Sequence, residues 1–323
     1  MNMRFEDFTG RGAAIKSLYE AFLVGAPSHA TLIVGPGGTG KRTLAGLLAQ
    51  SLFCQNGDKP CGVCPACKRF MGGSHPDSHY VREKKSIGVD EIRSLNLALQ
   101  SVAYEGGYKT VIIEDAGIMT VQAQNSLLKT LEEPPPGTVF LLTVTGVGEV
   151  LPTVRSRCRI VQMPSFSAEA VEEILVRRGV ERTQAARLAG LCQGSVGRAL
   201  SMQEDEGYWT LRSRVLRTME NVRGPWDVWT EVNAFKDDRG DSGRVLDILE
   251  GELREALLLN LSGKEPGEDG WAQALRGADA RSITGLLEKV AASRRMLASN
   301  VAWQAVLERF LLEYAKEYHQ WQS

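Results

Sequence analysis

The sequence lacks the hydrophobic runs that a membrane protein needs. Its 323 residues contain no apolar stretch that approaches the roughly 18 residues required to cross a bilayer. The first eight residues, MNMRFEDF, include two acidic side chains where a secretory signal requires a basic and then an apolar segment. These absences argue against a spanning or secreted protein and predict a cytoplasmic location without membrane partners.

An excess of either charge is also missing. Lys and Arg total 38, and Asp and Glu total 39. A generic binder of nucleic acid or membranes would carry a strong basic excess, so contact with DNA would need a local patch or partner subunits. The sequence shows no internal repeat and no low-complexity tract. Its composition, with 43% hydrophobic and 24% charged residues, is typical of a globular protein with roughly two or three domains.

Strand-like and helix-like segments alternate in the first half of the chain. Three short apolar runs are typical of buried strands: 31–34, 110–113 and 138–144. Three segments have helical periodicity: 13–23, 44–52 and 121–131. Strands separated by helices predict an α/β fold with a parallel sheet covered on both faces.

Helical periodicity alone continues after about residue 163. Two short amphipathic helices are predicted at 168–178 and 182–192, and the polar segment 203–207 is predicted to be a linker. All six tryptophans lie beyond this segment, which predicts a separately packed helical domain. An exposed loop is predicted at 261–270, where Gly, Pro and acidic residues cluster.

A phosphate-binding loop is predicted between a strand and a helix. Residues 35–41 read GPGGTGK and match the pattern G-x-x-x-x-G-K in the strand–loop–helix context that this pattern requires. The glycines let backbone N–H groups face a phosphate, and the helix N-terminus adds positive potential. Lys41 would reach the outer phosphates of a nucleotide.

Two departures weaken this loop as part of a catalytic site. The position after Lys41 normally holds a Ser or Thr that binds magnesium, but here it is Arg42, and Thr43 lies about 100° further round the helix. The strand that should end in Asp and then Glu ends in Glu114 and Asp115. A displacement of about 1 Å can lower a rate by roughly 10²-fold. We therefore expect a pocket able to hold ATP or ADP that disfavours Mg²⁺ and hydrolyses little or nothing.

Four of the six cysteines are crowded into one short segment: Cys54, Cys61, Cys64 and Cys67. Because a reducing compartment argues against disulfides and Zn²⁺ prefers tetrahedral sulfur, the spacing predicts a closed, structural zinc site. His75 and His79 lie just downstream and could compete as ligands, but with four sulfur atoms available we expect them to be surface or core residues. A zinc ribbon that grips DNA is another interpretation, but Lys59, Lys68 and Arg69 are too few to favour it.

Further motifs follow one another in a characteristic order: SHA at 28–30, IGVDEIR at 87–93, YEGGYK at 104–109, NSLLKTLEEPP at 125–135, LPTVRSRC at 151–158 and GRAL at 197–200. With the phosphate loop and the four cysteines, they resemble the AAA+ clamp-loader subunits, most closely the delta-prime family of bacterial DNA polymerase III. The resemblance runs through nearly the whole chain. It implies a RecA-like AAA+ domain over 1–163 with a zinc module at 54–67, a small helical lid over 164–203 and an all-α collar domain over 208–323.

The resemblance also implies roles for single residues. In the family, the arginine that matches Arg157 is an arginine finger that points into a neighbouring subunit's nucleotide site, where such a group contributes about 10³–10⁵ in rate. The alternative is that Arg157 pairs with an acid on its own surface. Thr145 matches a sensor-1 position and Arg198 matches the sensor-2 arginine. The predicted residues of the degenerate nucleotide site are Gly35, Gly38, Gly40, Lys41, Arg42, Thr43, Glu114, Asp115, Thr145 and Arg198.

The implied function is that of a delta-prime subunit, which hydrolyses little ATP itself and donates Arg157 to a gamma/tau ATPase neighbour. Its implied partners are gamma/tau and delta subunits in a hetero-pentamer, with the sliding clamp and primed DNA reached through the complex. The alternative is an ATP-hydrolysing gamma/tau motor subunit, which Arg42 and the Glu114–Asp115 order disfavour. A DNA-binding AAA+ repair factor is a third interpretation, which the balanced charge disfavours.

Overall fold

The computed structural model describes residues 5, 8, 12–83, 85–105, 107–235, 238–262, 271, 275 and 278–322, with backbone only for 238, 239 and 318–322. The chain forms two compact units. The first comprises Met1–Val180 and Gly194–Gly197, and the second comprises Glu181–Gln193 and Arg198–Ser323.

A five-stranded parallel sheet forms the centre of the first unit, with the strand order β2-β3-β4-β1-β5. The strands are β1 (Ala30–Val34), β2 (Ser78–Val81), β3 (Lys109–Ile113), β4 (Thr138–Val144) and β5 (Arg159–Gln162). The three inner strands are buried at every position, which explains their apolar runs. The two edge strands are partly exposed and more polar. The predicted α/β fold with a parallel sheet is confirmed.

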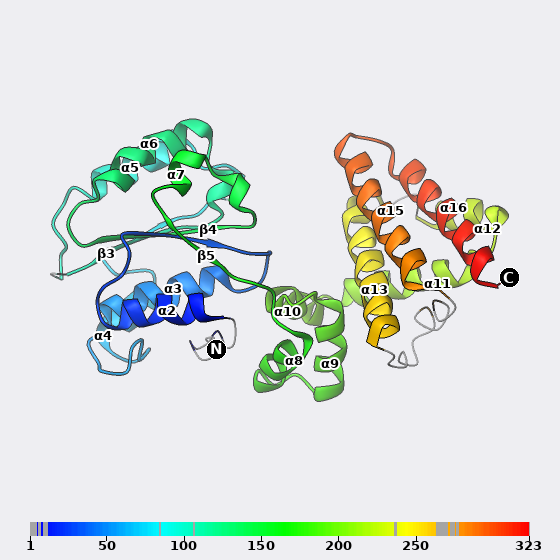
Figure 1. Ribbon diagram of the computed structural model, residues 1–323, viewed down its shortest axis with the longest axis horizontal. Coiled ribbons are helices and arrows are strands. Elements are labelled where there is room, and N and C mark those ends of the chain that lie inside the picture. Colours follow the sequence, from blue (N-terminus) through cyan, green and yellow to red (C-terminus); the bar gives the residue numbers. More distant parts are fainter. Residues whose placement is uncertain are drawn as a thin grey trace. The chain divides into compact units, whose positions relative to one another are not determined.

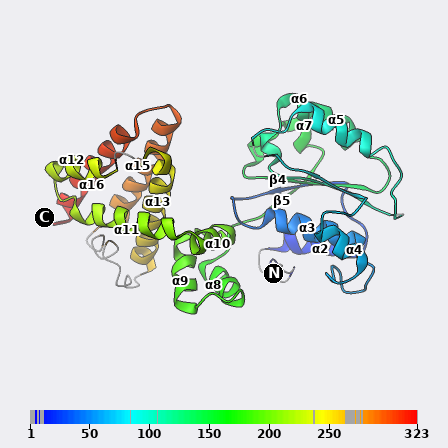
Figure 2. The same ribbon diagram turned by 180° about the vertical axis from the view of Figure 1, so that it is seen from behind.

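Helices cover both faces of this sheet (Figure 1). On one face lie α2 (Ala13–Leu23) and α3 (Lys41–Phe53), with α4 (Pro65–Met71) packed against α3. On the other face lie α5 (Val89–Ala98), α6 (Val121–Glu132) and α7 (Pro152–Arg155), an arrangement that is also visible from behind (Figure 2). The unit also contains η1 (Ala116–Ile118), η2 (Val147–Glu149) and α8 (Ala168–Arg177). The apolar faces of α5 and α6 and the sheet form one core, which fixes the strand ends that carry the site.

The second unit is helical throughout its described residues. Its elements are α9 (Arg182–Leu191), α11 (Glu206–Asn221), α12 (Pro225–Ala234), η3 (Asp238–Asp241), α13 (Ser242–Ser262), α15 (Ala280–Ala298) and α16 (Trp303–Gln322), while α10 (Val196–Glu204) spans the boundary between the units. In this bundle α15 packs against both α13 and α16. Buried Trp271 donates from its indole to the Tyr314 hydroxyl at 3.2 Å, and that hydroxyl donates to the Met219 carbonyl at 3.1 Å. None of the described helices combines the length and apolar character that a bilayer crossing requires.

Two segments predicted to lack regular structure need correction. The segment 203–207 is no linker, because α10 continues to Glu204 and α11 begins at Glu206. The carboxylate of Asp205 accepts the Tyr208 N–H at 3.0 Å and caps α11, so the polar residues of this segment are helix ends. In the predicted loop at 261–270, the first two residues end α13, and 263–270 lie outside the described residues.

Candidate functional site

The predicted phosphate loop lies between the carboxyl end of β1 and the N-terminus of α3. Gly38 and Gly40 have φ angles of +70° and +88°, a backbone region that side chains disfavour. At Gly35 a Cβ atom would lie 2.1 Å from the Met163 carbonyl oxygen, so only glycine fits there. The loop geometry therefore favours glycine at Gly35 and Gly40, which the sequence pattern specifies, and also at Gly38.

The side chain of Lys41 folds back onto this loop. Its Nζ donates to the carbonyl oxygens of Gly35 at 2.6 Å and Pro36 at 2.8 Å. Burial lowers the pKa of Lys41, while the nearby carboxylates of Asp115 and Glu149 oppose that shift. A phosphate group that entered the loop would compete with two carbonyl oxygens for this ammonium group.

Arg42 lies against the acid that follows β3. Its Nε is 2.7 Å from Glu114 Oε1, and Nε of Arg82 is 3.3 Å from the other carboxylate oxygen. Glu114 is only 8% exposed, and burial raises its pKa, whereas the charges of Arg42 and Arg82 lower it. Because a guanidinium keeps its charge at every pH that proteins meet, the two arginines hold positive charge beside this carboxylate. Thr43 lies half-buried in the first turn of α3.

Two loops after neighbouring strands complete this region. Asp115 has a left-handed backbone with φ of +50°, and its N–H donates to the Thr143 hydroxyl at 3.1 Å. The hydroxyl of Thr145 contacts the carboxylate of Glu149, which also accepts the N–H groups of Thr145 at 3.1 Å and Gly146 at 2.9 Å. The candidate sensor hydroxyl is thus already bound to an acid.

Arg198 belongs to the second unit, where its guanidinium donates to the Asp247 carbonyl at 3.2 Å. The preceding residue, Gly197, belongs to the first unit, and its N–H donates to the carbonyl of Gly38 in the phosphate loop at 3.1 Å. The predicted nucleotide-site residues other than Arg198 therefore all lie in the first unit. They lie at the carboxyl ends of its strands and at the N-terminus of α3.

Arg157 lies at the surface of the first unit, directly after α7. It contacts the carboxylate of Glu132 on α6 and donates to the Thr153 carbonyl at 2.8 Å. Its side chain is 32% exposed. By itself the chain therefore pairs Arg157 with an acid on its own surface, the alternative that the sequence leaves open. An exposed pair of this kind typically contributes less than about 1 kcal/mol, so a stronger anion could replace Glu132.

The four clustered cysteines converge on one point. Their sulfur atoms all lie within 4.8 Å of one another, and Sγ of Cys61 is 4.0 Å from Sγ of Cys67. A tetrahedral zinc ion with bonds of about 2.3 Å requires sulfur atoms about 3.8 Å apart. The donor set and its spacing therefore fit Zn²⁺ with small movements. Cys54 follows α3 and Cys64 caps α4, so the helix ends fix the positions of these ligands.

Backbone N–H groups surround these sulfur atoms. The amides of Cys61, Cys64 and Cys67 point at the preceding cysteine sulfur at 3.4, 3.4 and 3.5 Å. Backbone hydrogen bonds lower the pKa of Cys61 and lower that of Cys64 to about 6, whereas burial raises the pKa of Cys67 to about 12. A bound cation would favour the thiolate form of all four, since a coordinating thiol is deprotonated.

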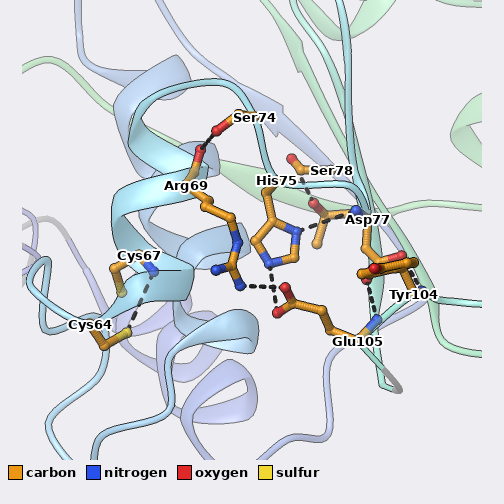
Figure 3. A network of polar contacts seen from close by, with 10 residues as sticks. Cys64, Cys67, Arg69, Ser74, His75, Asp77, Ser78, Tyr104 and Glu105 are labelled. Carbon is orange, nitrogen blue, oxygen red and sulfur yellow. Dashed lines mark hydrogen bonds and ion pairs between the residues drawn. The ribbon is translucent and has the colours of Figure 1, made fainter.

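His75 lies outside the cysteine cluster, in a separate polar network (Figure 3). Its Nδ1 accepts the Asp77 N–H at 3.3 Å, its Nε2 lies 3.6 Å from the Glu105 carboxylate, and its ring stacks on Phe53 at 3.9 Å. Among the described residues, neither His75 nor His79 belongs to the group that could hold a metal, which consists of the four cysteines alone.

The same network connects α4 to the loop before β3. Arg69 of α4 contacts the Glu105 carboxylate (Figure 3). The carboxylate of Asp77 accepts the N–H groups of Tyr104 at 2.7 Å and Glu105 at 3.0 Å. The cysteine segment, which holds the start of α4, is thereby linked to the backbone at 104 and 105.

Sequence reasoning missed several residues that determine this geometry. Arg82 adds the second positive charge at Glu114, Glu149 holds Thr145, and Glu132 holds Arg157. Arg82 and Glu149 are single charged residues outside every predicted motif. Glu132 lies in the motif at 125–135, but that motif did not indicate its contact with Arg157.

Comparisons with known proteins agree with the resemblance that the sequence motifs predict. A family model described as "DNA polymerase III, delta subunit" matches residues 10–167. The chain is 29% identical over 310 residues to "DNA polymerase III subunit delta'" of Bacillus subtilis, which covers 92% of this chain and 94% of that relative. It is 35% identical over 214 residues to the Escherichia coli protein of the same name, covering 63% of each chain. It is 31% identical over 274 residues to "DNA polymerase III subunit tau" of Escherichia coli, covering 80% of this chain and 42% of that relative. These relatives confirm the predicted resemblance.

Proposed function

We propose, from the premise that this chain is a member of the DNA polymerase III delta-prime family, that it is a clamp-loader subunit in DNA replication. It hydrolyses little or no ATP and donates Arg157 to the nucleotide site of a neighbouring gamma/tau ATPase. Its partners are gamma/tau and delta subunits in a hetero-pentamer that places a sliding clamp on primed DNA. Residues 1–163 act as the RecA-like AAA+ domain, residues 164–203 as the lid and residues 208–323 as the collar.

The observation that carries the non-hydrolysing role is the ion pair between Arg42 and Glu114. A working phosphate loop uses the residue after its lysine to bind magnesium. The acids after a second strand of the sheet, here β3, act on the metal and the attacking water. Here the side chains from these two positions bind each other. A magnesium ion would have to displace a guanidinium that is already 2.7 Å from the carboxylate.

The contacts of Arg157 support the donor role. Its guanidinium is partly exposed and is held by an exposed carboxylate, so the cost of releasing it is small. A phosphate oxygen would accept the same forked donors more strongly, since Arg–phosphate pairs are charge-assisted and frequently bidentate. In a neighbour's site this charge would stabilise the transition state of phosphoryl transfer.

The four cysteines support a structural zinc module. Cys54, Cys61, Cys64 and Cys67 would hold Zn²⁺ as thiolates in a closed tetrahedral set. Such an ion would hold together a segment that has only a small apolar cluster of its own, and it would leave no open position for catalysis.

The second candidate is an ATP-hydrolysing motor subunit of the gamma/tau type. Tau relatives match much of the chain, and this similarity is the reason to consider the second candidate. It would require Mg²⁺ beside Glu114, at the position that the Arg42 guanidinium contacts.

ATP hydrolysis separates the two candidates. The purified chain is expected to show no turnover near 1 s⁻¹, whereas a motor subunit stimulated by primed DNA would reach about that rate. In a complex reconstituted with gamma/tau and delta subunits, Arg157→Ala should leave assembly intact and lower hydrolysis by at least the share of one ATPase site. Arg157→Lys is the matched control for charge, and it should restore little, because lysine lacks the fork. Full hydrolysis by the Arg157→Ala complex would refute the donor role.

A further inference from the structure

Asn56 lies beside the four cysteines of the proposed zinc module. Its side-chain amide donates to Sγ of Cys61 at 3.3 Å, and its backbone carbonyl oxygen lies 3.9 Å from Sγ of Cys54. The other described donors to these sulfur atoms, apart from the cysteine thiols themselves, are backbone N–H groups. Asn56 is therefore the one described side chain outside the ligand set that donates a hydrogen bond to it.

The charge of a metal-loaded cluster would strengthen this contact. Four thiolates outweigh the two positive charges of Zn²⁺, so the loaded cluster carries net negative charge. An N–H group that donates to such a sulfur atom forms a charge-assisted hydrogen bond. A carboxylate at position 56 would instead be repelled by the cluster. Changes to groups that hydrogen-bond to metal ligands typically lower metal affinity by about 10–100-fold.

The residue after Asn56 makes its amide chemically labile. Asn56–Gly57 is the single Asn-Gly pair in the sequence. Asparagine is a thermolabile residue, and glycine places no side chain beside the peptide nitrogen that attacks the asparagine amide. Both residues are exposed, in a segment between α3 and α4 that is neither helix nor strand. Within the described part of the chain, no group accepts a hydrogen bond from the Gly57 N–H.

We propose that Asn56 is a site of spontaneous deamidation and that its conversion to an acid weakens the zinc site. The inference rests on the zinc module of the proposed function. It adds a covalent modification that replaces the N–H donor to Cys61 with a carboxylate.

The reaction needs only water. The Gly57 nitrogen attacks the side-chain carbonyl carbon of Asn56 and forms a five-membered ring, while the bond from that carbon to Nδ2 breaks. Ammonia leaves with the proton of the Gly57 N–H. Water then opens the ring and leaves aspartate or isoaspartate, so one water is consumed for each ammonia released.

The chain offers two controls for this chemistry. Asn125 is also exposed and precedes Ser126, but it lies within α6, where the helical backbone bonds engage the following N–H. At Gly57 an added Cβ atom would meet no atom within 4 Å, and the backbone does not adopt the left-handed region. Gly57→Ala therefore fits the fold and hinders only the attacking nitrogen.

Incubation of the full-length, zinc-loaded protein at mildly alkaline pH tests the modification. Peptide mass spectrometry should find aspartate and isoaspartate accumulating at position 56, while Asn125 in the same digest keeps its amide. Gly57→Ala should keep its zinc and should lose this accumulation.

Competition with a metal chelator tests the consequence for the metal. Asn56→Asp, which has the product's carboxylate, should bind Zn²⁺ at least about 10-fold more weakly than the wild type. Asn56→Gln keeps an uncharged amide and is the matched control, so it should bind Zn²⁺ more tightly than Asn56→Asp.

The outcomes separate this inference from the proposed function. If Asn56 keeps its amide as well as Asn125 does, the modification is refuted. If Asn56→Asp binds Zn²⁺ as tightly as the wild type, the link to the metal is refuted, and in both cases the zinc module stands. If the purified wild type contains no zinc, the module fails, and the inference fails with it. The donor role of Arg157 is tested separately, by hydrolysis in the complex.

Discussion

The guanidinium of Arg42 lies 2.7 Å from the buried carboxylate of Glu114. Both residues occupy positions that a working phosphate-loop enzyme uses to hold magnesium. In this chain they form an ion pair with each other, and Arg82 adds a second positive charge at 3.3 Å. A divalent cation would therefore have to displace this ion pair, while Gly38 and Gly40 of the adjacent loop keep the positive φ angles of a phosphate cradle.

Replacing Arg42 by threonine should reopen the site to magnesium. The substitution removes the guanidinium and supplies a hydroxyl, so ADP should bind the Arg42→Thr protein several-fold more tightly with Mg²⁺ than with a chelator. Turnover should stay well below about 1 s⁻¹, because the order Glu114–Asp115 is unchanged. Calorimetric titration measures both affinities. Arg42→Lys, which keeps the positive charge, is the control and should show no magnesium dependence. Equal affinity in both buffers for Arg42→Thr would contradict the assigned role of Arg42.

Neutralising Glu132 should free Arg157 without harming the protein. The pair is exposed, so Glu132→Gln should change the free energy of unfolding by less than about 1 kcal/mol. The variant complex should hydrolyse ATP at the wild-type rate or faster, because the carboxylate no longer competes with the phosphate for the guanidinium. A fall in hydrolysis as large as that caused by Arg157→Ala would mean that Glu132 itself is needed for the reaction.

Loss of the metal should loosen the backbone at Tyr104 and Glu105. Elemental analysis is expected to find one zinc ion per chain, and Cys64→Ser or chelation should release it. Because Arg69 of α4 contacts Glu105, hydrogen exchange at the amides of Tyr104 and Glu105 should then accelerate.

The control for this experiment lies in the sheet. The Phe140 amide donates to the His29 carbonyl at 2.7 Å and should keep its protection when the metal is lost. A purified wild-type chain without stoichiometric zinc would refute the metal assignment. Unchanged exchange at Tyr104 and Glu105 after zinc loss would refute the coupling.

The buried pair of Arg212 and Glu252 should be the most sensitive charged contact in the second unit. The two side chains form a bidentate contact at 2.6 and 3.0 Å, with both residues buried. Glu252→Ala should lower the free energy of unfolding by about 3–5 kcal/mol, because it removes the carboxylate that pairs with the buried guanidinium of Arg212. The double variant Arg212→Met, Glu252→Leu should lose far less. Urea titration measures both, with the exposed Lys316→Ala as the control. Equal losses in the single and the double variant would show that packing, rather than charge, dominates.

The sequence predicted those parts of the fold in which local pattern and burial agree. The segments 13–23 and 138–144 coincide with α2 and β4, because an amphipathic helix has a 3.6-residue apolar period and a fully buried strand is a short continuous apolar run. The short strands β2 and β5 were not predicted, since each has only four residues and lies, partly exposed, at an edge of the sheet, so neither forms an apolar run. Asp205 lies in the segment predicted to be a linker but caps α11, and the sequence does not separate the two because helix caps and loops use the same polar residues.

The candidate site likewise has one part that the sequence predicts and one part that it does not. Glycines and cysteines were predictable because phosphate cradles and zinc sites demand fixed spacings. The meeting of Arg42 with Glu114 and Arg82 was not, since it joins three segments that only the sheet brings together. The contact between Arg157 and Glu132 was equally unpredictable, because Glu132 lies 25 residues earlier, at the end of α6.

The position of the Arg157 guanidinium in the assembled complex tests most directly whether Arg157 acts in a neighbouring subunit's nucleotide site. A structure of the complex with a slowly hydrolysed ATP analogue should place its guanidinium about 3 Å from a γ-phosphate oxygen bound to a neighbouring subunit, with Glu132 released. Arg157 still bound to Glu132, together with Mg²⁺-nucleotide in this chain's own phosphate loop, would contradict it.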